Sequence, residues 1–239
     1  MGEGSGHKTL MQGHSRMVER NLRLGILGGT FDPVHIGHLQ IAKIALKLAS
    51  LDQVHFVTSV HPPHKSEKTH ANFLDRHAMV ALAVNGQKHF VPSSIEADRP
   101  GKSYSIDTIR QFRRYAGTQG KLFFIIGSDA FLELTSWKDY EQFPSLCNFL
   151  VFARPGFRTN ELGHPFYQSF SWKPLTRGRV SGRKEPLDHG MYLVRSYSSP
   201  ISSTEIRQKV QQGRSIIRFV PKGVQEYIEK VGLYRSARF

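Results

Sequence analysis

Two histidines three residues apart, His35 and His38, are the side chains in this 239-residue sequence best placed to do chemistry. They follow Gly28 and Gly29, which end an apolar stretch and let the backbone approach a ligand closely. The start of the following helix offers free N–H groups and a positive dipole end to an anion. Because residues three apart share one face of a helical turn, both imidazoles can act on a phosphoryl group that gains charge in its transition state.

This glycine turn matches neither common nucleotide-binding motif, since the sequence holds no G-x-G-x-x-G and no G-x-x-x-x-G-K-[ST] at this place. A plainer interpretation is that each histidine is a surface or capping residue. The glycine pair and the histidine pair together favour a phosphate site over that alternative.

A second group of phosphate-binding residue types forms the string I-S-S-T-E-I-R at the start of the penultimate predicted helix. Ser202 and Glu205 have the spacing of a capping box. Ser203 and Thr204 add hydroxyl and N–H donors, and Arg207 adds a fork-shaped cation one turn on. A well-capped helix explains Ser202 and Glu205 but explains Arg207 poorly.

Two loops supply candidate ligands for an anionic acceptor. Pro62–Lys65 follows the second predicted strand, and its prolines would hold the Lys65 ammonium where an acceptor phosphate lies. The alternative there is a rigid turn with a solvated lysine. Tyr104 and Ser105 belong to the string S-Y-S-I-D-T, which begins a helix. That string either caps the helix or offers N–H and hydroxyl donors to a carboxylate.

Polar and aromatic residues follow a later strand in the same way. The apolar run Leu122–Ile126 ends in Gly127, and Asp129 can accept hydrogen bonds from a ribose or an adenine-side group. Helix capping is the other role open to Asp129. Trp137 follows a short helix and can stack on an aromatic ring, although packing in the core is the ordinary role of a tryptophan.

Alternating strands and helices are predicted to position these candidates. Apolar runs predict strands at Leu22–Leu27, Val54–Val60, Phe90–Ile95, Leu122–Ile126, Phe149–Ala153 and Met191–Val194. Apolar residues at helical spacing predict helices from Leu39 to Leu48 and at Phe73–Val84, Ile106–Tyr115, Thr204–Gln212 and Val224–Val231. We therefore expect a doubly wound α/β fold, a mostly parallel sheet with helices on both faces.

A single domain over residues 23–239 is the expected organisation. Residues 1–22 are rich in Gly, His and Ser and are predicted to be a disordered leader or an artificial remnant. From Arg154 to Leu187 the alternation of apolar strand and helix patterns stops, and Pro, Gly, Arg and aromatic residues predominate. This composition predicts a long loop with short elements. Gly232 is predicted to cap the last helix.

The charge of the chain bounds the class of ligand. The sequence has 33 Lys and Arg against 19 Asp and Glu, a net charge of +14, and residues 154–239 hold 16 of the basic and 6 of the acidic residues. A basic nucleic-acid-binding module is one candidate function, but no reader motif or clear aromatic–basic interleaving supports it. We expect instead that the electrostatic field of these basic residues mainly attracts small anionic substrates.

Cysteine and histidine usage bears on compartment and metals. The single Cys147 excludes an internal disulfide and a Cys-rich zinc site, and predicts a reducing cytoplasm. No apolar run approaches the roughly 18–20 residues of a membrane span. A zinc site remains a minor alternative for a group of histidines whose spacings follow no compact ligand pattern, namely His55, His61, His64, His70 and His77. We expect no protein-bound metal.

The two phosphate motifs together resemble a known family. The string T-F-D-P-V-H-I-G-H is similar to the signature of the T/HxGH nucleotidyltransferase superfamily, which includes class I aminoacyl-tRNA synthetases. The string I-S-S-T-E-I-R resembles the I-S-S-T-x-I-R signature of its adenylyltransferase branch, whereas the synthetases carry a K-M-S-K-S loop that this sequence lacks. With the acceptor strings in the same order, Leu22 to Arg235 resembles the bacterial nicotinate-mononucleotide adenylyltransferases.

This resemblance implies a Rossmann-like nucleotidyltransferase fold and transfer of AMP from MgATP to nicotinate mononucleotide, with pyrophosphate leaving and no covalent enzyme intermediate. His35 and His38 would be catalytic. ATP would be bound by Gly28, Gly29, Thr30, Phe31, His35, His38, Gly127, Asp129, Ser202, Ser203, Thr204 and Arg207. The acceptor would be bound by Lys65, Tyr104, Ser105, Trp137 and Arg154.

The resemblance leaves some partners open. Mg²⁺ is expected with ATP, held mainly by the phosphates and water. Nicotinamide mononucleotide and phosphopantetheine are alternative acceptors, and the strings around Lys65 and Ser105 argue against the second. A homo-oligomer also stays open.

Overall fold

A computed structural model describes residues 21–62, 69–153, 157–158, 162, 164–168, 172–175, 190–195 and 201–235. Its strands are β1 (Arg23–Gly29), β2 (Gln53–Thr58), β3 (Phe90–Ser93), β4 (Lys121–Gly127), β5 (Asn148–Phe152), β6 (Trp172–Leu175) and β7 (Met191–Val194). They form one seven-stranded sheet in the order β3-β2-β1-β4-β5-β7-β6. Every neighbouring pair is parallel.

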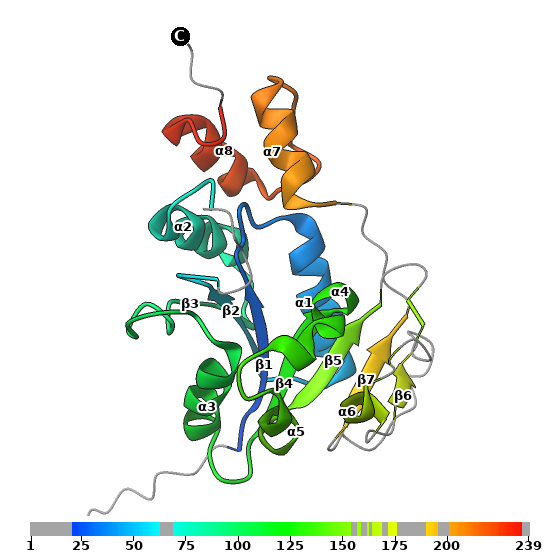
Figure 1. Ribbon diagram of the computed structural model, residues 1–239. Helices are drawn as coiled ribbons and strands as arrows, with labels where there is room; N and C mark the ends of the chain where they lie inside the picture. The colour runs from blue at the N-terminus through cyan, green and yellow to red at the C-terminus, as the bar shows by residue number, and fades with distance from the viewer. Residues whose placement is uncertain are drawn as a thin grey trace, which may run out of the picture.

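Helices join the strands and cover both faces of the sheet (Figure 1). The longer ones are α1 (Ile36–Leu48), α2 (Phe73–Val84), α3 (Ser105–Tyr115), α7 (Ser203–Gln211) and α8 (Lys222–Val231). The shorter ones are α4 (Ser128–Leu132), η1 (Leu134–Ser136), η2 (Tyr140–Gln142), α5 (Phe143–Leu146) and α6 (Pro165–Gln168). The doubly wound α/β fold predicted from the alternation is confirmed.

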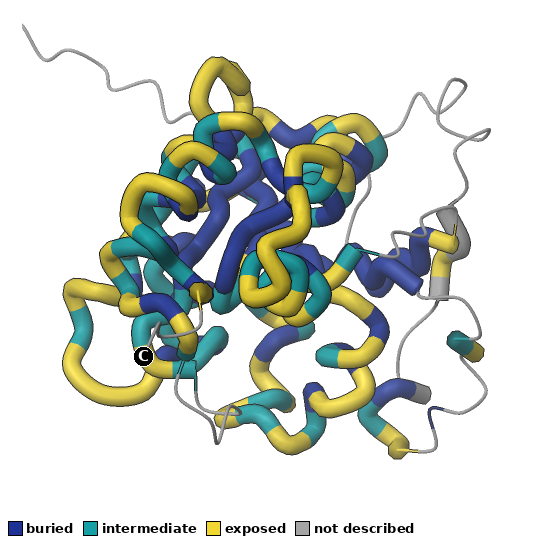
Figure 2. Tube along the Cα trace, turned by 90° about the horizontal axis from the view of Figure 1, so that it is seen from above, coloured by how far each residue is buried: buried dark blue, intermediate teal, exposed yellow. Residues whose placement is uncertain are grey.

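The core is divided by the sheet into two clusters. Because side chains alternate along a strand, Phe123 and Ile125 of β4 pack on the side of α1, α2 and α8, whereas Leu122 and Phe124 pack on the side of α3, α4 and α5. Buried segments therefore run through the middle of the molecule and exposed segments surround them (Figure 2). Burial on both faces explains why these strands read as continuous apolar runs.

The strand order fixes where a ligand can bind. From β1 the chain moves outward to β2 and β3, then returns to β4 beside β1 and moves outward again on the other side. The two loops that leave β1 and β4 consequently run to opposite faces and leave a crevice between them. In open α/β sheets such a switch point is where ligands bind.

The predicted strand ends differ from the observed ones by a few residues. β1 continues through Gly28 and Gly29, because these glycines remain paired with Val57 and Thr58 of β2. The segment predicted as a long loop contributes β6, which extends the sheet beyond β7. At the far end Gly232 adopts a left-handed conformation with φ of 76° and caps α8 as predicted.

None of the helices in the described part of the chain is both long and apolar enough to cross a membrane.

Candidate active site

A cleft of about 360 Å³ opens at the switch point, where β1, β2 and β4 end. Its floor is formed by β1 from Leu27 to Gly29 and by β4 from Phe124 to Gly127. One wall is Thr30 with His38 of α1, and the other runs from Ser103 to Ile106 at the start of α3. Trp137, Lys138 and Phe143 close the end next to α3.

Two glycines keep the floor of the cleft open. A Cβ atom added at Gly28 or at Gly127 would meet no atom within 4 Å, so both positions adjoin open space. Gly25, earlier in the same strand, is different, because a Cβ there would lie 2.7 Å from the Leu51 side chain. Gly28 and Gly127 therefore leave room for a ligand, whereas Gly25 serves packing.

The histidine pair lies at the start of α1. His35 is the N-cap residue and His38 lies in the first turn, with their ring centroids 3.7 Å apart. The Phe31 ring meets the His38 ring edge-on at 5.1 Å. The His35 N–H donates to Nδ1 of His38 at 3.2 Å, which places the proton of a neutral His38 on Nε2.

Burial keeps both imidazoles neutral. It lowers the pKa of His35 to about 4, and it lowers the pKa of His38 well below the usual 6.5, with the neighbouring His35 lowering it further. At neutral pH the two rings therefore carry N–H dipoles and no positive charge. A neutral donor fixed by its neighbours is suited to a charge that develops during reaction.

Asp32 holds the turn between the glycines and the histidines. Its carboxylate, only 3% exposed, accepts hydrogen bonds from the N–H groups of His70 at 2.8 Å and Ala71 at 3.2 Å. The Tyr234 hydroxyl donates to it at 2.7 Å, and burial together with Asp32 raises the pKa of that phenol, so it stays a donor. Residues 202 positions apart are thereby joined beneath the turn.

The second motif attaches to the same turn. Ser202 caps α7 by accepting from the Glu205 N–H at 3.1 Å, as its spacing predicted. The Ser203 hydroxyl donates to the carbonyl oxygen of Pro33 at 2.9 Å. Arg207 donates to the carbonyl oxygen of Asp32 at 2.8 Å and to the Thr204 hydroxyl at 3.3 Å. The start of α7 is thus fixed against the histidine turn.

Arg76 is a buried cation that the sequence prediction missed. The side chain, 1% exposed, donates through Nη1 to the carbonyl oxygens of Thr30 at 2.6 Å and Ser59 at 2.7 Å. It therefore joins the loops that follow β1 and β2. One signal was present in the sequence: Arg76 shares a helical face with Met79 and Val80, both of which are buried.

The start of α3 is held by a different set of bonds. The Ser103 hydroxyl accepts from the N–H groups of Val60 and His61, each at 3.1 Å. Behind it, the Thr108 hydroxyl donates to the buried carboxylate of Glu96 at 2.7 Å and accepts from Arg99 at 2.7 Å. These bonds fix the position of the α3 N-terminus, where Tyr104 and Ser105 line the cleft.

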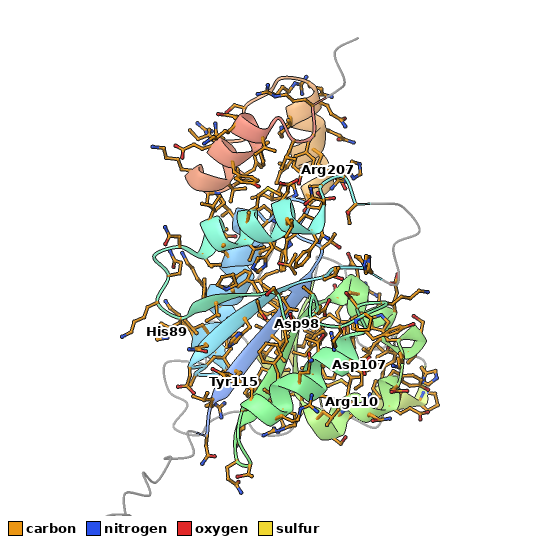
Figure 3. All side chains as sticks on the ribbon, turned by 90° about the vertical axis from the view of Figure 1, so that its left-hand side faces the viewer. His89, Asp98, Asp107, Arg110, Tyr115 and Arg207 are labelled. Atoms are coloured by element: carbon orange, nitrogen blue, oxygen red, sulfur yellow. The ribbon has the colours of Figure 1, made fainter. Side chains whose placement is uncertain are left out.

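Surface ion pairs fix the segment that carries Trp137. Arg110 of α3 contacts Asp107 at 3.0 Å and Asp139 at 3.0 Å, and Lys138 contacts Asp107 at 3.2 Å. Figure 3 shows Asp107 and Arg110 together on α3, well apart from Arg207 at the base of α7. The indole of Trp137 packs edge-on against Phe124 and Phe143, each at 6.1 Å.

The cleft brings together residues from both predicted sets, namely Gly28, Gly29, Thr30, His38, Gly127, Tyr104, Ser105 and Trp137. Phe31 and His35 contact His38 from behind. Asp129 lies exposed in the first turn of α4, and the α7 residues contact the turn without lining the cleft. Lys65 and Arg154 lie outside the described residues.

Three of the histidines considered for zinc have separate partners. His55 bonds Gln53 at 3.1 Å, His77 bonds Thr58 at 3.3 Å, and His70 lies by Asp32. His64 lies outside the described residues. Within the described ranges, no three His, Cys, Asp or Glu side chains come together as a metal site.

Comparisons with known proteins agree with this geometry. Residues 26–209 match the cytidylyltransferase-like family. A probable nicotinate-nucleotide adenylyltransferase of Thermoanaerobacter sp. (strain X514) is 38% identical over 219 residues, covering 92% of this chain and 97% of the relative. A protein of the same description from Thermus thermophilus is 39% identical over 214 residues, covering 90% of this chain and 100% of the relative. The chain belongs to the nicotinate-nucleotide adenylyltransferase family.

Solved structures share the fold of this family member. The nicotinic acid mononucleotide adenylyltransferase of Plasmodium falciparum, complexed with NaAD, has a TM-score of 0.66 at 21% identity, covering 89% of this chain and 97% of the other. The same enzyme complexed with APC gives a TM-score of 0.66 at 20% identity. At this identity the likeness shows the Rossmann-like fold, which the sheet order had already indicated.

Proposed function

We propose that the protein transfers AMP from MgATP to nicotinate mononucleotide, forming deamido-NAD and pyrophosphate. The observation that carries this proposal is the neutral histidine pair, stacked at 3.7 Å beside open strand-end glycines at the switch point. The family to which the chain belongs is named for this reaction, and its relatives match nearly the whole chain.

The two ends of the cleft have different tasks, since one binds ATP and the other binds the acceptor. At one end Gly28 and Gly29 let the triphosphate approach the backbone, and the His38 Nε2–H donates to the α-phosphate as charge develops there. At the other end the start of α3 and Trp137 seat the pyridine ring of the acceptor. The acceptor phosphate attacks the α-phosphorus in line, the bond to the pyrophosphate oxygen breaks, and pyrophosphate leaves.

No general base is required, because the attacking phosphate is already an anion at neutral pH. The protein instead orients the two nucleotides and stabilises the charge that moves to the leaving group. Arg207 and the α7 N-terminus contact the histidine turn, and there they would neutralise the β- and γ-phosphates.

Magnesium fits this cleft as an ion that arrives with ATP. Of the acidic side chains in the described residues, Glu96 lines the cleft, and it is engaged by Thr108 at 2.7 Å near the acceptor end. Asp32 is likewise engaged by three donors. Mg²⁺ would neutralise the phosphates while ATP and water supply its ligands.

The excess of basic residues supports this proposal better than nucleic-acid binding. Two highly anionic nucleotides must enter the same cleft, and a net charge of +14 favours their approach. We also propose a cytoplasmic reaction, which rests on the single Cys147, buried here as a free thiol.

Pyrophosphate release with MgATP tests the proposal, with nicotinate mononucleotide, nicotinamide mononucleotide and phosphopantetheine compared in parallel. We expect the nicotinate compound to give the highest kcat/KM. Release of no pyrophosphate with any acceptor, together with tight and salt-sensitive RNA binding, would instead favour the nucleic-acid-binding module.

A further inference from the structure

Lys138 holds a distinct position in the cleft. It is the one lysine or arginine among the described residues that line the cleft, and it lies at the acceptor end beside Trp137. Its Nζ is 4.8 Å from the centroid of the Tyr104 ring, which also lines the cleft. A cation over an aromatic face at this distance is attracted to it. The ammonium is therefore kept at the mouth of the ring-binding end.

The backbone of Lys138 is fixed on both sides. Trp137 is packed against two phenylalanines, and Asp139 is paired with Arg110 at 3.0 Å. The Lys138 side chain remains 44% exposed and contacts one carboxylate, Asp107, at 3.2 Å. Asp107 is shared with Arg110 at 3.0 Å, so it neutralises Lys138 only in part.

The Lys138 ammonium can distinguish a charged ligand from a neutral one. Nicotinate and nicotinamide rings have the same size and nearly the same shape, and they differ by one negative charge. A pocket built on shape discriminates weakly between such molecules, whereas a fixed cation a few ångström away acts on the acid alone. The N–H and hydroxyl donors at the start of α3 can bond either a carboxylate or an amide oxygen, and although they bond the charged acid more strongly, they carry no full positive charge of their own.

We propose that Lys138 is a specificity-determining residue that favours the acidic pyridine mononucleotide over its amide. The inference rests on the proposed function, because it assigns an acceptor preference to the same cleft. Its ammonium attracts the pyridine carboxylate, and Asp107 tempers that attraction as the competing counter-ion.

A merely structural role for Lys138 predicts something different. If the pair between Lys138 and Asp107 only held Trp137 in place, removing either partner would harm the site in the same direction. If Lys138 acts by charge, removing the lysine weakens binding of the acid, whereas removing the aspartate leaves a less neutralised cation and strengthens it. The two substitutions therefore separate the two roles.

The experiment compares kcat/KM for nicotinate and nicotinamide mononucleotides at saturating MgATP. Lys138→Gln is expected to lower the acid-to-amide ratio about tenfold, through KM for the acid, with KM for ATP unchanged. Lys138→Arg retains the charge and should keep the ratio within about twofold. Lys222→Gln is the matched control, because it removes an ion-paired lysine of α8 that does not line the cleft.

Asp107→Asn completes the test. A higher acid-to-amide ratio supports the proposal, and an equal or lowered ratio overturns it. An unchanged ratio in Lys138→Gln also overturns it. Calorimetric binding of each mononucleotide gives the ratio without turnover, so a wild-type protein that binds the acid but makes no product would contradict the proposed function and leave the specificity inference standing.

Discussion

The two ends of the cleft are held in different ways. At the histidine turn the bonds are buried and join distant parts of the chain, as with the hydrogen bonds that Tyr234 and Ala71 donate to Asp32. At the acceptor end the start of α3 has buried bonds of its own, but the segment that carries Trp137 is held by ion pairs between half-exposed side chains, as with Arg110 and Asp139. Buried hydrogen bonds are costly to break and insensitive to salt, whereas exposed ion pairs contribute little and are screened.

This difference suits the chemistry that we propose for each end. The phosphate end must hold donors in place while charge develops, so rigidity there has catalytic value. The acceptor end must discriminate between similar rings. For this a correctly placed charge matters more than a rigid framework. The following predictions test that contrast.

The largest effect is expected from His38→Ala. Loss of a fixed donor to the developing charge should lower kcat by about 10²–10³-fold, with a much smaller change in either KM. Pyrophosphate release measures kcat, and circular dichroism verifies the fold. His89→Ala, which removes an exposed histidine at the far side of the sheet, is the matched control (Figure 3). A near-normal kcat in His38→Ala would remove the basis for the mechanism.

Acid should weaken the fold through the buried histidines. Burial lowers the pKa of both His35 and His55 to about 4, against about 6.5 in an unfolded chain. The unfolded state therefore binds more protons in this window, and stability is full above pH 6.5 and falls as the pH drops toward 4. Each group accounts for up to ~3 kcal/mol at pH 4.

Urea denaturation between pH 7 and pH 4 measures this loss, and His55→Leu isolates one contribution. His55 packs against Phe112 of α3 and does not line the cleft. The variant should lose less stability on acidification than the wild type while keeping its kcat at pH 7. An identical pH dependence in both proteins would show that His55 is not held neutral.

Tyr234→Phe tests the buried end directly. Removing the hydroxyl takes a 2.7 Å bond from a buried carboxylate, which should lower the free energy of unfolding by about 1–3 kcal/mol and raise KM for ATP more than KM for the acceptor. Tyr227→Phe is the matched control, since its hydroxyl bonds the half-buried Asp75 at 2.9 Å and joins α8 to α2 without touching Asp32. If both variants change the stability and the KM for ATP equally, the bond between Tyr234 and Asp32 does not support the ATP end of the cleft.

The smallest effect is expected from Arg110→Gln. The residue pairs with two carboxylates but is 37% exposed, so the variant should lose no more than about 1 kcal/mol of stability. Denaturation in low salt and in about 1 M NaCl separates the contributions, because screening should remove most of the difference from wild type. A loss of stability that persists in high salt would show that these ion pairs contribute as the buried bonds of the histidine turn do.

Much of the site could be predicted because its parts are local. The strand-end glycines, the three-residue spacing of His35 and His38, and the capping spacing of Ser202 and Glu205 each depend on a few neighbouring residues. Such patterns can be recognised in the sequence, because nearby residue types set the backbone geometry within one turn. The positions of Lys65 and Arg154, outside the described residues, stay predictions.

Long-range links were not predicted, and the reason is physical. Nothing near Asp32 in the sequence indicates that Tyr234 will donate to it, or that Arg76 will bond the loops after β1 and β2. Such bonds exist only when the sheet and the helices on its faces have brought distant segments together. The same holds for Lys138, whose neighbour Asp107 comes from another part of the chain.

By itself the sequence determined the alternation of strands and helices, the phosphate turn and the chemical types on it, because periodicity and local backbone preference act within a few residues. Only the tertiary structure decided that both imidazoles are neutral, because burial sets their pKa. It also decided that the histidine turn is tied by buried bonds and the Trp137 segment by exposed ion pairs, because solvent access determines what each contact contributes.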